Sequence, residues 1–422
     1  MHFLILTQYF PPEMGAAQVR LGVLVRELQK NGHSVEVVTA IPRHVVGPRL
    51  AAKQRGIYAR DLYFGAVVHR TWVYPGTGFG ARRLMGYLSF TFSSFLGLAR
   101  SKRPDFLIVE SPPLFLGLSA WLYGIFRRVP FIFYVADLWP ESVRAIGVIK
   151  DGMLFKLAEQ LERFIYERAK YIAAATAGIL STLTSKKRVA PSKVFFLPNG
   201  VDTHAITPVT RDEALLDELG LRGKSVFLYA GNHGAVAGLE TLVRTAKLLE
   251  RSNSVILFVG DGQEKPDLVR LASAQGLGNV RFVGAKPVEE MPRYHSIALA
   301  TIVHVRKGDL FKATRPAKLF TSLACGVPAI YCGEGEAADL VRQEGVGLVV
   351  PPEEPAELAK AIETLEAQPR LRADMAVKAR VLAEREFGWD LIISRWLDQL
   401  RDAEAADRSK PPALSSAVER AS

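Results

Sequence analysis

The sequence predicts an α/β protein with two doubly wound domains that face a central cleft. Three observations support this prediction. The chain has 422 residues, which is more than one hydrophobic core usually holds. Short apolar runs alternate with amphipathic stretches, as strands alternate with helices in doubly wound sheets. After a polar connector near residues 203–222 the alternation starts again, so both halves follow one plan.

The first half opens with a strand at residues 3–7, a loop, and an amphipathic helix that ends at Gly32. A strand at residues 35–39 completes a strand–helix–strand unit. These strands are continuous apolar runs, which is typical of parallel sheets covered on both faces. The same pattern predicts strands at residues 66–73, 106–110, 131–136, 171–174 and 194–197, and helices at 85–100, 114–126 and 152–168.

The second half repeats the plan from a strand at residues 225–230. We place one domain at residues 1–203 and the other at 204–385. A helix at residues 386–402 is expected to cross back to the first domain, and residues 403–422 are expected to be a disordered tail. The further expected strands are 255–259, 280–283, 299–304, 329–331 and 347–350, and the expected helices are 239–251, 263–274, 318–324, 355–366, 370–386 and 390–400.

Composition excludes several classes of protein. Apolar residues make up 49% and charged residues 23%, which indicates a folded chain. Cys325 and Cys332 are the only cysteines, so we expect a reduced, cytoplasmic compartment, with no disulfide framework and no metal site. The N-terminus runs directly into a strand pattern and has no clear secretory signal. The longest apolar run, residues 112–126, is shorter than the roughly 20 residues of a membrane span, which favours a buried helix.

Positive charge is concentrated in the first half. Residues 1–188 contain 25 Lys and Arg against 12 Asp and Glu, whereas residues 189–422 contain 29 against 31. We therefore expect this half to face an anionic surface, as a peripheral protein at the inner face of the plasma membrane. Solvated charge without a role is the alternative, and no signature indicates nucleic-acid binding. The aromatic segment at residues 87–95 is either the membrane contact or a core helix.

One predicted helix N-terminus is unusually cationic. Thr314 can cap this helix and Pro316 suits its first turn. Arg315 and Lys318 bring positive charge where the helix dipole disfavours it. A bound diphosphate would supply the compensating anion, and two solvated cations are the alternative.

Two glycine loops follow strands in similar positions. Gly15 lets the backbone approach a ligand at a helix N-terminus, although it can equally be a turn residue. Gly260 follows a strand and opens a helix, a pattern shared by phosphate loops and by ordinary tight turns.

Five motifs follow one another in the second half: Gly231-Asn232-His233-Gly234, Val259-Gly260-Asp261-Gly262, Phe282-Val283-Gly284, Pro316-Ala317-Lys318-Leu319-Phe320 and Ala324-Cys325-Gly326-Val327-Pro328. In this order, the motifs resemble those of the retaining family 4 glycosyltransferases, which have the two-Rossmann GT-B fold. The resemblance covers about residues 2–400. Segments 8–13 and 137–142 are similar to the branch that builds surface polysaccharides, including aminosugar and fucosamine-type transferases.

The resemblance implies a role for each matching position. The loops at Gly15 and at residues 231–234 border the donor diphosphate from the two domains, and the turn at residues 282–286 lies near the base. The helix beginning near Arg315 has its N-terminus over the phosphates. The expected donor-binding residues are Gly15, Gly231, Asn232, His233, Gly260, Gly284, Lys286, Arg315, Lys318, Thr321 and Ser322.

The sequence also departs from the family pattern. Most members carry two Glu separated by seven residues, and here these positions are Ala313 and Thr321. Thr321 or Ser322 would only partly replace the Glu that holds the ribose. The usual Arg and Lys of the 231–238 loop are absent, so Arg315 and Lys318 are expected to carry the phosphate charge. These departures leave the donor open more than the reaction class.

The resemblance implies metal-independent transfer without a cofactor, in which helix N-termini and cations stabilise the leaving diphosphate. Asp137, at the end of a first-domain strand, is our candidate for orienting or deprotonating the acceptor hydroxyl, and a helix cap is its alternative. Glu141 is a weaker acceptor-site candidate. We therefore predict transfer of a hexose or N-acetylhexosamine from a UDP- or GDP-sugar to a lipid-linked saccharide. Two alternative functions remain: a sugar-nucleotide epimerase of the same fold, and a non-catalytic scaffold in polysaccharide assembly.

Overall fold

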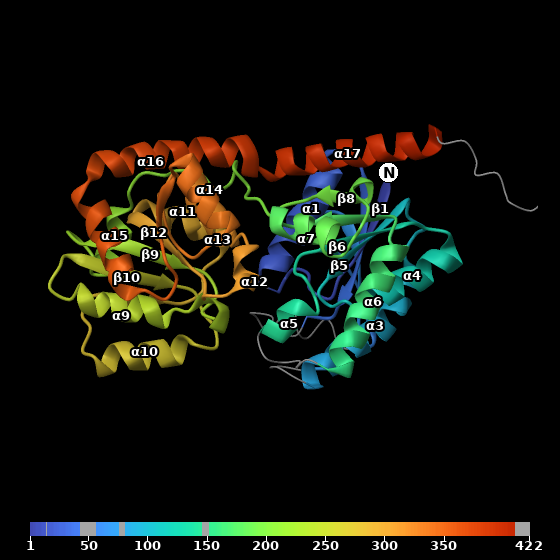
Figure 1. Cartoon of the computed structure of the whole chain (residues 1–422), viewed down its shortest axis with the longest axis horizontal. Coiled ribbons are helices and arrows are strands. Elements are labelled where there is room, and N and C mark those ends of the chain that lie inside the picture. Colours follow the sequence, from blue (N-terminus) through green and yellow to red (C-terminus); the bar gives the residue numbers. More distant parts are fainter. Residues whose placement is uncertain (14, 43–55, 76–80, 146–151, 410–422) are drawn as a thin grey trace, which may run out of the picture.

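The computed structural model describes residues 1–13, 15–42, 56–75, 81–145 and 152–409. In this part of the chain two α/β domains lie side by side, and two long C-terminal helices run along the same side of both (Figure 1). The predicted pair of doubly wound domains is therefore confirmed.

The first domain contains a sheet with strand order β3-β4-β2-β1-β5-β6-β7-β8. All neighbouring strands are parallel except β3 and β4, which pair antiparallel at one edge. The strands are β1 (His2–Leu6), β2 (Ser34–Ala40), β3 (Tyr58–Tyr63), β4 (Ala66–Thr71), β5 (Phe106–Ser111), β6 (Phe131–Val135), β7 (Tyr171–Ala174) and β8 (Val194–Phe196). The helices are α1 (Ala16–Lys30), α3 (Ala81–Arg100), α4 (Leu116–Arg127), α5 (Glu141–Ala145), α6 (Met153–Arg168) and α7 (Ala177–Ser185).

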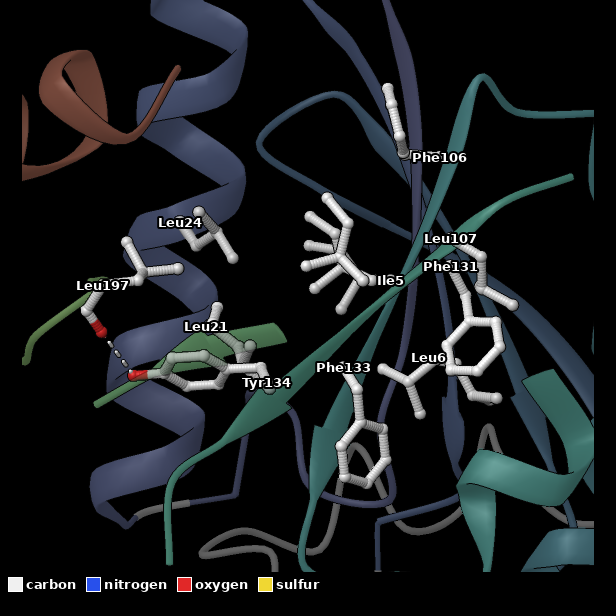
Figure 2. Close-up of a cluster of buried hydrophobic side chains, with 14 of the residues drawn as sticks. Ile5, Leu6, Leu21, Leu24, Phe106, Leu107, Phe131, Phe133, Tyr134 and Leu197 are labelled. Atoms are coloured by element: carbon white, nitrogen blue, oxygen red, sulfur yellow. Dashed lines mark hydrogen bonds between the residues drawn. The ribbon is translucent and has the colours of Figure 1, made fainter. Parts of the chain in front are cut away.

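Apolar strand residues and one face of α1 form the core of this domain (Figure 2). Leu21 and Leu24 of α1 point toward the sheet, where Tyr134 and Leu197 also lie. The Tyr134 hydroxyl donates to the Leu197 carbonyl at 3.1 Å, so the buried polar group is satisfied. Because central strands are covered on both sides, their inward and outward residues are both apolar.

The second domain contains a parallel sheet with strand order β11-β10-β9-β12-β13-β14. Its strands are β9 (Ser225–Ala230), β10 (Ser254–Val259), β11 (Val280–Val283), β12 (Ala298–His304), β13 (Ala329–Cys332) and β14 (Gly347–Val350). Its helices are α8 (Glu213–Glu218), α9 (Glu240–Leu248), α10 (Lys265–Ala274), α11 (Met291–Ser296), α12 (Asp309–Lys312), α13 (Ala317–Ala324), α14 (Glu336–Glu344), α15 (Pro355–Ala367) and α16 (Pro369–Leu382). Short helical turns occupy Pro191–Lys193, Ala235–Ala237, Val288–Glu290 and Ala383–Phe387.

Helix α17 (Trp389–Ser409) returns the chain to the first domain (Figure 1). Trp389, Ile393 and Trp396 are buried in the core of the first domain. The helix continues beyond residue 402, where we expected a disordered tail. Glu404 and Asp407 accept hydrogen bonds from the Tyr171 hydroxyl, and these contacts stabilise the last turns. Residues 410–422 of the expected tail lie outside the described part of the chain.

Seven other elements of the described chain were not predicted: strand β3 and helices α5, α7, α8, α11, α12 and α14. Strand β3 alternates half-buried and exposed residues at a sheet edge, so it lacks the apolar run that marked the other strands. Helices α7, α8 and α14 are each at most nine residues long, and helices this short give weak periodicity. Helix α8 lies inside the expected connector, and its Leu215 and Leu216 are buried in the second domain.

Candidate functional site

Two glycine loops meet at the carboxyl ends of β9 and β10. Gly231 directly follows β9 and Gly260 directly follows β10, both with positive φ angles (148° and 146°). A Cβ at Gly260 would collide with the carbonyl oxygen of Gly231, so only glycine permits this approach. The backbone N–H of His233 donates to the Asp261 carbonyl at 2.8 Å and ties the loops together. Carboxyl ends of parallel strands are where doubly wound sheets bind ligands.

Lys318 lies beside these loops in the first turn of α13. Its Nζ donates to the Tyr229 hydroxyl at 2.9 Å and lies 4.6 Å from the centre of the Tyr229 ring. A Cβ at Gly231 would lie 3.1 Å from Lys318 Cε, so the lysine stem packs on the loop. Burial lowers the pKa of Lys318 to about 8. Among the described residues, no carboxylate accepts a hydrogen bond from Lys318. Its charge is therefore available to an incoming anion.

His233 is buried between the two loops. Its ring lies 5.7 Å from that of Tyr229 and 5.9 Å from that of Phe258. Within the described part of the chain, neither ring nitrogen has a hydrogen-bond partner. Burial, with a smaller contribution from the positive charge of Lys265, lowers the pKa of His233 to about 4. The imidazole is therefore neutral at pH 7, and its placement fits a role in shaping the loops.

Arg315, immediately before α13, faces the first domain. Its guanidinium pairs with the Glu336 carboxylate, and both side chains are largely buried. Glu336 also accepts hydrogen bonds from the backbone N–H groups of Ala177 at 3.1 Å and Gly178 at 2.8 Å, in the first turn of α7. Arg315 therefore lies where the two domains touch, rather than beside Lys318 as a second free cation.

Two expectations about the α13 region were wrong. Thr314 does not cap α13, because its hydroxyl donates to the Phe311 carbonyl at 2.8 Å and the helix begins after Pro316. Ser322 is fully buried and donates to the Val327 carbonyl at 2.9 Å. It faces the core side of α13, so it does not reach a ligand at the helix N-terminus.

The other expected donor residues of the second domain lie in three segments: the loop after β9, the segment after β11, and α13. Asn232 is exposed in the first loop, and Gly284 is exposed at the end of β11, beside β10. Lys286 lies 6.0 Å from the Tyr294 ring. The Thr321 hydroxyl donates to the Ala317 carbonyl at 3.4 Å, within its own helix.

In the first domain, Gly15 precedes α1 as its N-cap residue, at the position expected for an anion-facing helix N-terminus. Asp137 follows β6, and its side chain is exposed to solvent. Desolvation by the surrounding protein raises the pKa of its carboxyl group. Arg20 opposes that rise in the pKa of Asp137, and Glu110 adds to it. The arrangement places an accessible carboxylate near a fixed ion pair.

That ion pair joins Arg20 of α1 to Glu110 at the end of β5. Arg20 also donates to Asn199 Oδ1 at 2.9 Å and lies 4.9 Å from the Tyr134 ring centre. Glu110 accepts from the Thr7 hydroxyl at 2.8 Å. Buried charges in such a network fix one geometry at the carboxyl edge of the sheet.

Glu141 has a different environment from Asp137. Its carboxylate binds Lys187, and Lys187 also donates to Glu162 at 2.5 Å. Burial, with the nearby Glu141, raises the pKa of Glu162 to about 7. Glu141 therefore belongs to an ion network between α5, α6 and the end of α7.

The sequence analysis missed Arg20, Glu110, Tyr229 and Glu336. Glu110 had a usable signal, because a carboxylate ends an otherwise apolar strand. Tyr229 looked like any core strand residue, and Glu336 like any first-turn acid. Their partners come from distant segments, which no local pattern specifies.

Among the described residues, no group of three or more His, Cys, Asp or Glu side chains has the arrangement of a metal site. In the same part of the chain, no helix combines the length and apolarity needed to span a membrane.

Each of the two domains matches a known protein family. The family described as "Glycosyl transferase 4-like domain" matches residues 15–200, and "Glycosyl transferases group 1" matches residues 212–381. The chain is a glycosyltransferase, and its second domain matches the group 1 family. WcaI of Escherichia coli, described as a colanic acid biosynthesis glycosyl transferase, is 26% identical over 415 residues, covering 95% of this chain and all of WcaI.

Solved structures of this fold match most of the chain. Sucrose-phosphate synthase from Thermosynechococcus elongatus matches with a TM-score of 0.77 and 19% identity, covering 96% of this chain and 99% of that one. Anabaena HepE in complex with UDP and glucose matches with a TM-score of 0.73 and 16% identity, covering 94% and 99%. The GT-B fold implied by the resemblance is confirmed.

Proposed function

We propose that this glycosyltransferase transfers a hexose or N-acetylhexosamine from a nucleoside diphosphate sugar, with UDP-sugars as the first donors to test, to a lipid-linked saccharide. The observation that carries the proposal is Lys318, held on Tyr229 beside the two glycine loops. Such an arrangement of a cation, a helix N-terminus and close backbone binds diphosphate. HepE, which shares the fold, has been solved with UDP and glucose.

The donor charge is neutralised by the protein in this proposal. Lys318 and the first amides of α13 contact the diphosphate, and Gly15 at the N-terminus of α1 approaches it from the other domain. Stabilising the leaving group in this way lowers the barrier to breaking the bond between C1 and the phosphate oxygen. The exposed Asn232 and Gly284 border the sugar and the base.

We propose that transfer proceeds with retention at C1. The acceptor oxygen bonds to C1 on the face from which the diphosphate leaves, and the departing phosphate oxygen takes the acceptor proton. Asp137 accepts a hydrogen bond from another hydroxyl group of the acceptor and so orients the reacting hydroxyl, whose own proton stays available to the phosphate oxygen. Its exposure beside the fixed Arg20–Glu110 pair suits this role.

The acceptor reaches the enzyme from a membrane surface in this proposal. Helix α3 packs on α4, and α4 packs on α6, so the three helices form one layer. Large apolar side chains of this layer are exposed: Phe92 (74%), Phe126 (80%), Met153 (77%) and Leu154 (73%). Exposed Arg82 of α3 and Lys156 of α6 lie on the same helices, and exposed Arg128 directly follows α4, so together they suit an anionic leaflet.

The membrane contact differs from the one expected at residues 87–95. Tyr87 and Phe90 are buried in the first domain, so only part of that segment faces outward. Similar proteins support a place in surface polysaccharide assembly. WcaI is described as a colanic acid biosynthesis glycosyl transferase, and WaaG, whose structure has the same fold, as a glycosyltransferase involved in lipopolysaccharide biosynthesis. The family match favours transfer over the epimerase and scaffold alternatives.

Calorimetric titration of the purified protein with UDP, GDP and the corresponding monophosphates tests the donor site. We expect a response to one base that requires the diphosphate. Transfer is then measured with the matching sugar nucleotides and with lipid-linked saccharides from bacterial membranes. Absence of both binding and transfer with every nucleotide would overturn the proposal.

A further inference from the structure

Glu336 is the one carboxylate in the described structure that bonds to the first turn of α7 from the second domain and pairs with Arg315 at the same time. It begins α14, directly after Gly335. Its two oxygens accept from successive amides, those of Ala177 and Gly178. Thr176 completes the α7 terminus by accepting from the Ile179 N–H at 3.0 Å.

The domains touch closely at this point. A Cβ added to Gly178 would lie 2.6 Å from the Ala313 Cβ and 3.4 Å from Glu336 Oε2. Gly178 lies inside a helix, where alanine is normally the better residue. Its smallness is therefore explained by the contact between domains and not by the conformation of α7.

We propose that Glu336 is a positioning residue for the transfer reaction, which couples docking of the two domains to the placement of Arg315. The inference rests on the proposed function for its kinetic part, and on the docking contact alone for its structural part. When α7 sits on α14, the Glu336 carboxylate is shared between the α7 amides and the Arg315 guanidinium.

The physical reason lies in the charges. A carboxylate at a helix N-terminus is stabilised by free amides and by the helix dipole. The same carboxylate fixes a guanidinium most firmly when its own position is fixed. Docking of α7 therefore immobilises Arg315 just before α13, the helix that carries Lys318. Separation of the domains would leave Glu336 and Arg315 free to move together away from this geometry.

Hydrogen exchange at the amides of Ala177 and Gly178 tests docking without any substrate. We expect Glu336→Ala to increase exchange at both amides, and Glu336→Gln to increase it less, because a Gln carbonyl still accepts one bond. Asp339→Asn is the matched control. Asp339 lies in the same first turn of α14, pairs only within the helix with Arg342 at 3.3 Å, and is exposed.

Kinetics test the coupling. Both Glu336 variants are expected to raise the donor KM and lower kcat/KM by about tenfold or more, because Arg315 loses its fixed partner and the first turn of α13, which carries Lys318, is then less firmly placed. Gly178→Ala is expected to lower kcat/KM while α7 stays folded. Adding Ala313→Gly should recover part of the loss by removing the Cβ that Gly178→Ala meets.

The two parts fail separately. Unchanged exchange at Ala177 and Gly178 in Glu336→Ala would overturn the docking contact, whatever the enzyme transfers. Increased exchange with unchanged donor KM and kcat would overturn the positioning role. Absence of transfer by the parent enzyme would count against the proposed function, and the exchange result would still decide the docking.

Discussion

The Arg20 guanidinium on α1 pairs with the Glu110 carboxylate at the end of β5, and both side chains are almost completely buried. The pair lies at the carboxyl edge of the first sheet, in the electrostatic reach of Asp137. Asn199, which follows β8, and Thr7, which follows β1, complete its hydrogen bonds. One buried ion pair thereby joins four segments around the proposed acceptor site.

Removing one partner of this pair should destabilise the protein. Arg20→Ala leaves Glu110 buried without its cation, which typically costs about 3–5 kcal/mol. Urea denaturation measures the change. The double variant Arg20→Leu with Glu110→Leu should lose less free energy of unfolding than the two single variants lose in sum. A free energy of unfolding for Arg20→Ala within about 1 kcal/mol of the parent would contradict the network.

Asp137→Asn should separate binding from transfer. The variant is expected to bind nucleotide as the parent does, because Asp137 belongs to the other domain from Lys318. Transfer should fall by about 100-fold or more when the acceptor hydroxyl loses its carboxylate. Calorimetry and initial rates measure the two quantities. Equal turnover in variant and parent would remove Asp137 from the mechanism.

Donor affinity should depend on pH through Lys318. Burial lowers the pKa of Lys318 to about 8, so the free protein loses this charge above that pH. A bound diphosphate favours the charged form and raises the pKa again, so affinity should fall by about tenfold per pH unit above 8.

Calorimetry at pH 8.5 in two buffers of different ionisation enthalpy should show proton uptake on UDP binding. Lys318→Arg should abolish the uptake, and Lys378→Ala, a surface lysine on α16 that pairs with Asp374, should not. Uptake that persists in Lys318→Arg would assign the titration to another group.

Membrane binding should depend on the exposed apolar layer. Replacing Phe92 and Leu154 by Glu removes apolar area and adds negative charge, so we expect at least about tenfold weaker binding to phosphatidylglycerol–phosphatidylethanolamine vesicles. Vesicle sedimentation measures this. The control is Val377→Glu, at an exposed apolar residue of α16 in the other domain. Equal losses in both variants would argue against a specific surface.

The two glycine loops were the part of the candidate site that the sequence located best. Gly231 and Gly260 each follow an apolar strand, and parallel strands bring such loops to one edge. Lys318 follows from the same logic, because a cation at a helix N-terminus needs an anion. These are local signals, and the fold preserves them.

Other site features needed the tertiary structure. Thr321 and Ser322 are neighbours in the chain, yet only Ser322 is buried, since α13 turns it toward the core. Likewise, Arg315 and Lys318 look alike in the sequence and have different partners, Glu336 and Tyr229.

The sequence by itself determined the two doubly wound domains, the positions of the glycine loops and the concentration of basic charge in residues 1–188. Periodicity, turn residues and composition are local quantities, and local quantities can be read from a chain. Only the tertiary structure decided that Arg20 pairs with Glu110, and that Glu336 joins Arg315 to α7. Those contacts form between segments about 90 to 160 residues apart, so their energies depend on packing that no single stretch of sequence contains.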